Sequence, residues 1–122
     1  MYAGFAVLLL LHGFAHVVGF VGPWGLSSSV EPQTTMLAGR IPMGATGMRA
    51  LGIFWLGGAL AFTIAAVGVL RHAPWWPAFT FGTAIGSLVL CILSLPQSKI
   101  GIPINVAIIV TMLVSHPEVV RS

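Results

Sequence analysis

The chain has very little charge and almost no acid. Its 122 residues include five Lys or Arg and only two Asp or Glu, so the formal net charge of +3 reflects a scarcity of acid. Nucleic-acid binding requires clustered Lys and Arg that displace counterions from phosphates. We therefore predict no nucleic-acid partner. A single cysteine, Cys91, excludes an internal disulfide.

Apolar side chains are correspondingly abundant. Hydrophobic residues make up 57% of the chain before its 15 glycines are counted. In a soluble domain the apolar share is about 45–50% with glycine included. The composition therefore predicts an integral membrane protein whose first partner is the lipid bilayer.

Four apolar segments are separated by turns that carry proline, glycine or charge. The first is long enough to cross the roughly 30 Å hydrocarbon core and has no basic segment before it, which disfavours a signal peptide. We predict one domain over 1–122 of the all-α class, a four-helix transmembrane bundle with both termini on the same side. The predicted spans are 2–21, 49–70, 75–95 and a short 102–116, and the loop 23–44 is a candidate lid.

Two stripes of residues follow the third span. Gly82 and Gly86 form a G-x-x-x-G pair, which predicts close contact with another helix, as do Gly57, Ala61 and Ala65 on the second span. The other stripe is polar and should face the bundle interior. This polar stripe comprises Thr80, Thr83, Ser87, Cys91 and Ser94. Its side chains either form hydrogen bonds between helices or line one wall of a polar cavity.

Histidines four residues apart, His12 and His16, share one face of the first span. Ionisable side chains inside a membrane are costly and turn toward partners or cavities, which makes them candidates for function. Other polar residues gather at the end of the bundle that holds the loop 23–44. The candidate site residues are His12, His16 and Arg49 as catalytic side chains, with Asn105, Ser94, Ser87 and Glu31 as substrate-binding side chains.

Three interpretations of the histidine pair compete. A metal or haem at His12 and His16 is disfavoured. Zinc needs three or four ligands, and a bis-histidine haem needs opposed histidines on different helices. We therefore predict no cofactor. In the second, a neutral imidazole acts as acid, base or substrate contact while Arg49 holds an oxygen. In the third, both are core histidines that bond to the polar stripe or to Asn105.

Three motifs together resemble a known group of proteins. They are His-Gly-Phe-Ala-His at 12–16, Arg49 with Leu-Gly-Ile-Phe-Trp-Leu-Gly-Gly-Ala at 51–59, and Lys-Ile-Gly-Ile-Pro-Ile-Asn at 99–105. The chain is loosely similar to the DoxX-like group of small bacterial membrane proteins, some members of which are associated with quinone-linked redox complexes. The resemblance implies a four-helix bundle in the bacterial cytoplasmic membrane and assigns no catalytic residue.

Our leading hypothesis is a membrane protein that binds a lipophilic small molecule in a cavity lined by His, Arg and Asn, and transforms it by acid–base chemistry. The first alternative is a non-catalytic subunit of a larger membrane complex of the redox type, and a homo-oligomer is a related expectation. A small transporter comes third, because the spans contain no acidic residue that could couple ion movement.

Overall fold

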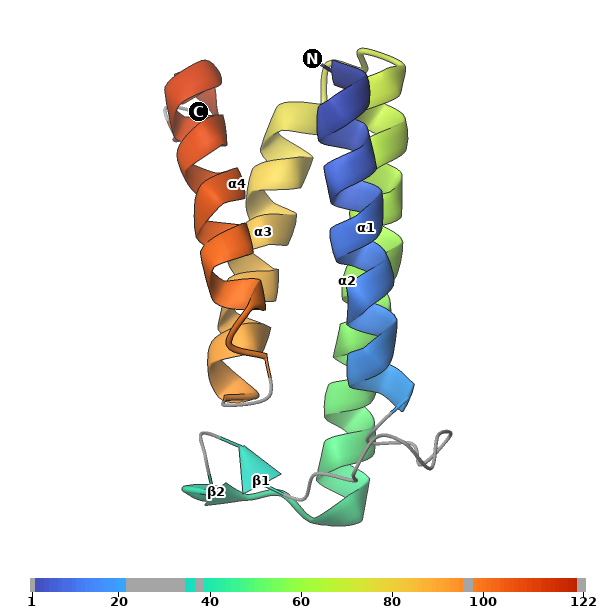
Figure 1. Cartoon of the computed structure of the whole chain (residues 1–122), viewed down its shortest axis with the longest axis vertical. Coiled ribbons are helices and arrows are strands. Elements are labelled where there is room, and N and C mark those ends of the chain that lie inside the picture. Colours follow the sequence, from blue (N-terminus) through green and yellow to red (C-terminus); the bar gives the residue numbers. More distant parts are fainter. Residues whose placement is uncertain (1, 22–34, 37–38, 96–97, 121–122) are drawn as a thin grey trace.

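The structure is a computed structural model that describes residues 2–21, 35–36, 39–95 and 98–120 (Figure 1). Within that part the chain is almost entirely helical, which confirms the all-α class and the four helices predicted. A two-stranded antiparallel hairpin precedes α2, and a 3-10 helix follows α4. The elements are α1 (Tyr2–Val21), β1 (Thr35–Met36), β2 (Ile41–Pro42), α2 (Gly44–Leu70), α3 (Trp76–Leu93), α4 (Gly101–Ser115) and η1 (Pro117–Val120).

The helix bounds agree closely with the apolar segments, except at the start of α2. That helix begins at Gly44 instead of Arg49. Gly44 has a φ of 69°, a left-handed conformation that glycine adopts at little cost, so the chain can turn sharply from β2 into the helix. Arg49 carries a charge, so the uncharged apolar run begins only after it, although the helix begins five residues earlier. The sequence pattern therefore showed where the apolar part of α2 begins and missed the true start.

The helices form two antiparallel pairs. α1 packs most extensively against α2, and α3 packs against α4 (Figure 1). At one end of the bundle the ring of Trp76 lies 6.3 Å from that of Tyr2 and 4.8 Å from that of His116. His72 belongs to the same end, because its ring is 4.9 Å from Tyr2. The start of α1, the α2–α3 turn and the end of α4 are therefore close neighbours.

Glycines bring α1 and α2 into close contact. A Cβ on Gly13 would lie 2.8 Å from Cβ of Phe62, and a Cβ on Gly58 would lie 2.8 Å from Cδ2 of His16. Real Cβ atoms do not approach other atoms so closely. Glycine at these two positions is therefore required by the packing.

Gly82 and Gly86 behave differently from the prediction. A Cβ at either position, or at Gly57, would meet nothing within 4 Å in the described chain. The prediction that the G-x-x-x-G pair packs against another helix of this chain is therefore wrong. The spacing shows that a backbone could approach closely, but it does not show whether the fold brings a helix to that face.

The outer surface of the bundle is apolar. Two helices of the described chain, α2 over Thr46–Leu70 and α3, are long and apolar enough to cross a membrane. α1 over Tyr2–Val17 and α4 are shorter apolar helices. These lengths and compositions support association with a membrane.

Candidate functional site

His12 and His16 lie side by side on the buried face of α1. Their side chains are 6% and 1% exposed, and their ring centroids are 4.9 Å apart in an edge-to-face arrangement. Both rings contact Phe62 on α2, and the ring of His16 also lies 5.0 Å from that of Trp55. Phe62 belongs to one apolar cluster and Trp55 to another, so the histidines sit where the two clusters meet.

The hydrogen bonds of His16 define its tautomer. Nδ1 lies 2.8 Å from the carbonyl oxygen of His12. Because a carbonyl can only accept, Nδ1 must carry the hydrogen and donate it. Nε2 of a neutral His16 is then an acceptor, and the Oγ–H of Ser87, 2.6 Å away, donates to it. His16 is therefore positioned as a base facing a serine hydroxyl.

Asn105 on α4 connects the two histidines. Its Nδ2 donates to the carbonyl oxygen of Gly101 at 3.0 Å and to Oγ of Ser87 at 2.9 Å. The Gly101 carbonyl fixes the amide orientation, since only the nitrogen can donate. Oδ1 of Asn105 therefore accepts from Nε2 of His12 at 3.1 Å.

These four side chains form a closed set of hydrogen bonds that we call the polar network. It runs from His12 to Asn105, from Asn105 to Ser87, from Ser87 to His16, and from His16 back to the His12 carbonyl. It joins α1, α3 and α4. All four residues are among those predicted from the sequence, but the sequence could not order them.

A close approach at the start of α4 sets the position of Asn105. A Cβ on Gly101 would lie 2.6 Å from Sγ of Cys91, so α4 begins directly against α3. Cys91 is 1% exposed, and its Sγ lies 3.5 Å from Nδ2 of Asn105. The helical spacing of the sequence places Cys91 in the polar stripe. In the structure it packs directly against the polar network.

The other predicted site residues lie elsewhere. Ser94 is buried, and its Oγ accepts a hydrogen bond from Nε1 of Trp55 at 3.3 Å, two helical turns from Ser87. Arg49 is exposed on the first part of α2, six residues before Trp55 and so roughly 9 Å along the axis from it. Glu31 and most of the candidate lid 23–44 fall outside the described residues. The catalytic role predicted for Arg49 stays a prediction.

The rest of the polar stripe divides between two environments. Thr80 is fully buried, and its hydroxyl has no hydrogen-bond partner in the described chain. Thr83 is half-buried and donates to the carbonyl oxygen of Phe79 at 2.8 Å. The stripe is therefore partly interior, as predicted, and partly at the edge of an open surface.

That open surface is a groove of about 870 Å³ between α2 and α3. Its wall is almost wholly apolar, and Ser87 and Thr83 are the polar side chains among its lining residues. Since the Thr83 hydroxyl bonds to its own helix, Ser87 is the polar contact that leads to the histidines. The lining residues are Met36, Met43, Gly47, Ala50, Leu51, Ile53, Phe54, Gly57, Gly58, Ala61, Thr83, Gly86, Ser87, Val89, Leu90 and Leu93.

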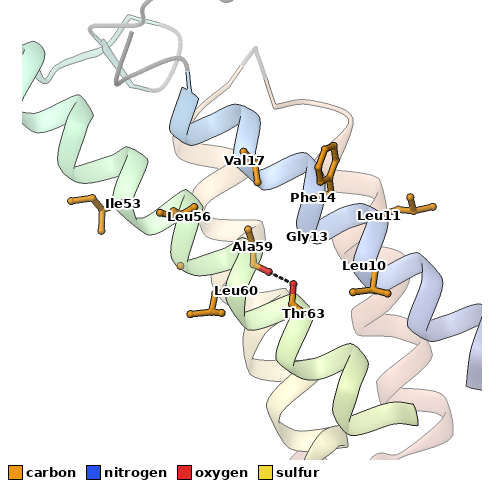
Figure 2. A pocket seen from close by; sticks show the side chains of 11 residues that line it. Leu10, Leu11, Gly13, Phe14, Val17, Ile53, Leu56, Ala59, Leu60 and Thr63 are labelled. Atoms are coloured by element: carbon orange, nitrogen blue, oxygen red, sulfur yellow. Dashed lines mark hydrogen bonds between the residues drawn. The ribbon is translucent and has the colours of Figure 1, made fainter. Parts of the chain in front are cut away.

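A second groove, of about 840 Å³, lies between α1 and α2 (Figure 2). Thr63 is the polar side chain in its wall, and Figure 2 shows its hydroxyl bonded to the carbonyl oxygen of Ala59, at 2.9 Å. Leu10, Leu11 and Phe14 line the α1 side. Its described lining contains none of His12, His16, Ser87 and Asn105, which distinguishes it from the α2–α3 groove.

No group of three or more His, Cys, Asp or Glu in the described residues could hold a metal ion. The expectation that the protein uses no cofactor stays a prediction. Comparisons with protein-family models, curated proteins and solved structures give no match to this chain. The resemblance to the DoxX-like group likewise stays a prediction.

Proposed function

We propose that this chain is an integral membrane protein that binds a lipophilic small molecule in the α2–α3 groove. Ser87 and His16 serve as its polar contact and act on the bound molecule by acid–base chemistry. The bundle spans the bacterial cytoplasmic membrane with both termini on the same side. The observation that carries the proposal is that Ser87 lines the groove and bonds to His16.

The distribution of polarity supports the membrane location. Six polar side chains are buried in the described chain: His12, His16, Thr80, Ser87, Ser94 and Asn105. Large apolar side chains cover the outside, among them Leu11, Phe14, Phe54, Leu60 and Val114, each more than 60% exposed. Water would disfavour such a surface, whereas lipid matches it.

The shape and polarity of the groove indicate the kind of ligand. An apolar wall with one polar point fits a molecule with a long hydrocarbon part and an oxygen-bearing end. The apolar part would contact Phe54, Val89 and Leu93, and the oxygen would reach Ser87. His16, behind Ser87, can accept a proton through that hydroxyl.

A matched pair of glycine variants tests the groove. Leu at position 86 projects from the groove wall, whereas Leu at position 82 projects from a residue outside the lining; neither Cβ meets another atom within 4 Å. The probe is a long-chain alcohol bearing a photoreactive diazirine, added to the purified chain in detergent. We expect saturable crosslinking to α2 and α3 that Gly86→Leu reduces and Gly82→Leu preserves. Equal crosslinking in the two variants would contradict the proposal.

One observation favours the alternative of a subunit in a larger membrane complex. Gly82 and Gly86 present an open backbone surface, where a helix of another chain could pack closely. In that case Gly82→Leu would dissociate a complex isolated in mild detergent and leave the diazirine crosslinking unchanged. The two functions therefore differ in their measurements: ligand binding in the groove is shown by loss of crosslinking in Gly86→Leu, and a helix interface is shown by dissociation of the complex in Gly82→Leu.

A further inference from the structure

We propose that Ser87 is a nucleophile activated by His16, and that the substrate is a lipophilic carboxylic ester bound in the α2–α3 groove. The inference rests on the proposed function, because it uses the same groove. It adds the substrate class and assigns the reaction as acyl transfer to the serine. His16 is the general base, and Asn105 is the donor for the oxyanion.

The Ser87–His16 pair has the geometry of an activated serine. Oγ and Nε2 are 2.6 Å apart, within the range of about 2.6–3.2 Å found for nucleophile and base pairs. A third group orients the base, since the His12 carbonyl accepts from Nδ1 at 2.8 Å. That bond leaves Nε2 free of hydrogen and able to take the serine proton. A carbonyl stabilises the imidazolium less than a carboxylate would, so we expect slow turnover.

The imidazole of His16 is also held sterically. The backbone of Gly58 leaves no room for a Cβ beside Cδ2 of His16, and Trp55 and Phe62 pack on the ring. A base that is confined in this way keeps its alignment with Ser87. These contacts cover the faces of the ring and its Cδ2 edge, and they leave Nε2 facing Ser87.

Asn105 is placed to stabilise the negative oxygen that forms during attack. Its Nδ2 donates one hydrogen to the Gly101 carbonyl and the other to Oγ of Ser87 at 2.9 Å, and during attack this second hydrogen bond passes from Oγ to the oxyanion on the carbon that becomes bonded to Oγ. His12 donates to Oδ1 of Asn105 and so holds the amide in this orientation. His12 is a positioning residue in this scheme, and Asn105 is a catalytic one.

Access to Ser87 selects the substrate. Ser87 is only 3% exposed, and it lines a groove that is otherwise almost wholly apolar. A short, water-soluble ester would bury little apolar surface in that groove, whereas an ester with a long hydrocarbon chain would bury apolar surface along its length. The preferred substrate is therefore a long-chain ester.

The reaction balances with water as the second reactant. Oγ of Ser87 forms a bond to the ester carbonyl carbon while its proton moves to Nε2 of His16, and the carbonyl electrons move to oxygen. The tetrahedral intermediate then collapses, and the bond to the alcohol oxygen breaks. His16 returns the proton to the departing alcohol. Water next attacks the acyl-serine with His16 as base, which releases the carboxylic acid and restores the hydroxyl.

A fluorophosphonate with a long alkyl chain tests the nucleophile directly. It forms a bond between phosphorus and an activated serine oxygen and releases fluoride. The full chain in detergent is treated with the probe, and mass spectrometry identifies the modified residue. We expect modification at Ser87 that Ser87→Ala abolishes, and a much slower reaction with a short-chain fluorophosphonate.

Two further variants separate an activated serine from a structural one. His16→Gln should slow modification of Ser87 by about 100-fold or more while circular dichroism and size-exclusion profiles stay unchanged, because general bases contribute roughly 10²–10⁴. Ser94→Ala is the control, since Ser94 is a buried serine at the C-cap of α3 and its described partner is the indole of Trp55. In Ser94→Ala, the fluorophosphonate should modify Ser87 at the wild-type rate.

Several outcomes would overturn the proposal. Two of them concern the wild-type protein: the probe does not modify Ser87, or it modifies Ser87 and Ser94 equally. Neither of these results requires a variant that folds correctly. Modification of folded His16→Gln at the wild-type rate would also overturn the proposal. If the diazirine alcohol still crosslinks to the groove while Ser87 is inert, the proposed function stands and the nucleophile is rejected. If both probes fail, both proposals are rejected.

Discussion

At the scale of single residues, two backbone carbonyls determine the chemistry of the polar network. The Gly101 carbonyl orients the amide of Asn105, and the His12 carbonyl sets the tautomer of His16. Every other bond in the network takes its direction from these two. A substitution in the network therefore removes more than one hydrogen bond.

The first prediction concerns Asn105. Asn105→Leu leaves Nε2 of His12 without its acceptor and Oγ of Ser87 without a donor, in a buried site. Each buried polar group left without a partner costs about 1–3 kcal/mol, so we expect a melting temperature lower by several degrees in detergent. Thr111→Val on the exposed face of α4 is the control and should have little effect. An unchanged melting temperature in Asn105→Leu would show that the network contributes no stability.

The second prediction uses two adjacent glycines. Gly58→Ala places a Cβ 2.8 Å from the His16 ring, so the α1–α2 contact must shift, at a cost of about 1–3 kcal/mol. Gly57→Ala places its Cβ in open space and gains up to about 1 kcal/mol of helix propensity. The melting temperature should fall in the first variant and rise or stay constant in the second. A shift of the same sign in both would contradict the described packing.

At the scale of elements, the start of α4 against α3 positions Asn105. Gly101 permits this contact because Sγ of Cys91 occupies the space that a Cβ would need. Nothing in the sequence pairs these two residues, since glycine at the start of a helix and a lone cysteine are both common. Their relation appears only when the two helices are packed together.

The third prediction is a double-mutant cycle on this contact. Gly101→Ala should lower the melting temperature, because its Cβ would lie 2.6 Å from Sγ of Cys91. In a Cys91→Ala background the sulfur is gone, and the same change should cost little. The stability effects of the two substitutions should therefore be non-additive. Additive effects in thermal unfolding would show that the two residues do not meet.

At the scale of the whole molecule, an apolar exterior surrounds a polar centre. The start of α1 and the end of α4 lie at one end of the bundle with the α2–α3 turn, through the contacts of Trp76 with Tyr2 and His116. The proposed membrane arrangement follows if all four helices cross the bilayer. The ends of the chain must then share one side.

The fourth prediction tests that arrangement. Single cysteines replace Tyr2 or Glu118, both exposed, in a Cys91→Ala background. A membrane-impermeant maleimide should label the two positions in vesicles of the same orientation and leave both unlabelled in vesicles of the opposite orientation. A cysteine at Arg71 in the α2–α3 turn should follow the same pattern. Labelling of positions 2 and 118 from opposite sides would exclude the four-span arrangement.

The sequence by itself determined the number, class and approximate bounds of the helices. Apolar runs that proline, glycine or charge interrupts depend on local chemistry, which a linear pattern records. The start of α2 was missed because the charge of Arg49 separates the first residues of the helix from the apolar run. The helical spacing also placed His12 and His16 on one face, since a helix repeats every 3.6 residues wherever it lies.

Only the tertiary structure decided which faces meet. It placed Asn105 and Ser87 against the histidines, and it kept Ser94 with Trp55 and Arg49 on the surface. It also left Gly82 and Gly86 open, although their spacing is typical of a helix contact. Periodicity gives the face of each helix, but the rotation and crossing of one helix against another depend on side-chain volumes from several segments at once. The groove beside Ser87 is lined by α2 and α3 together, and a property of two helices cannot be seen in either one alone.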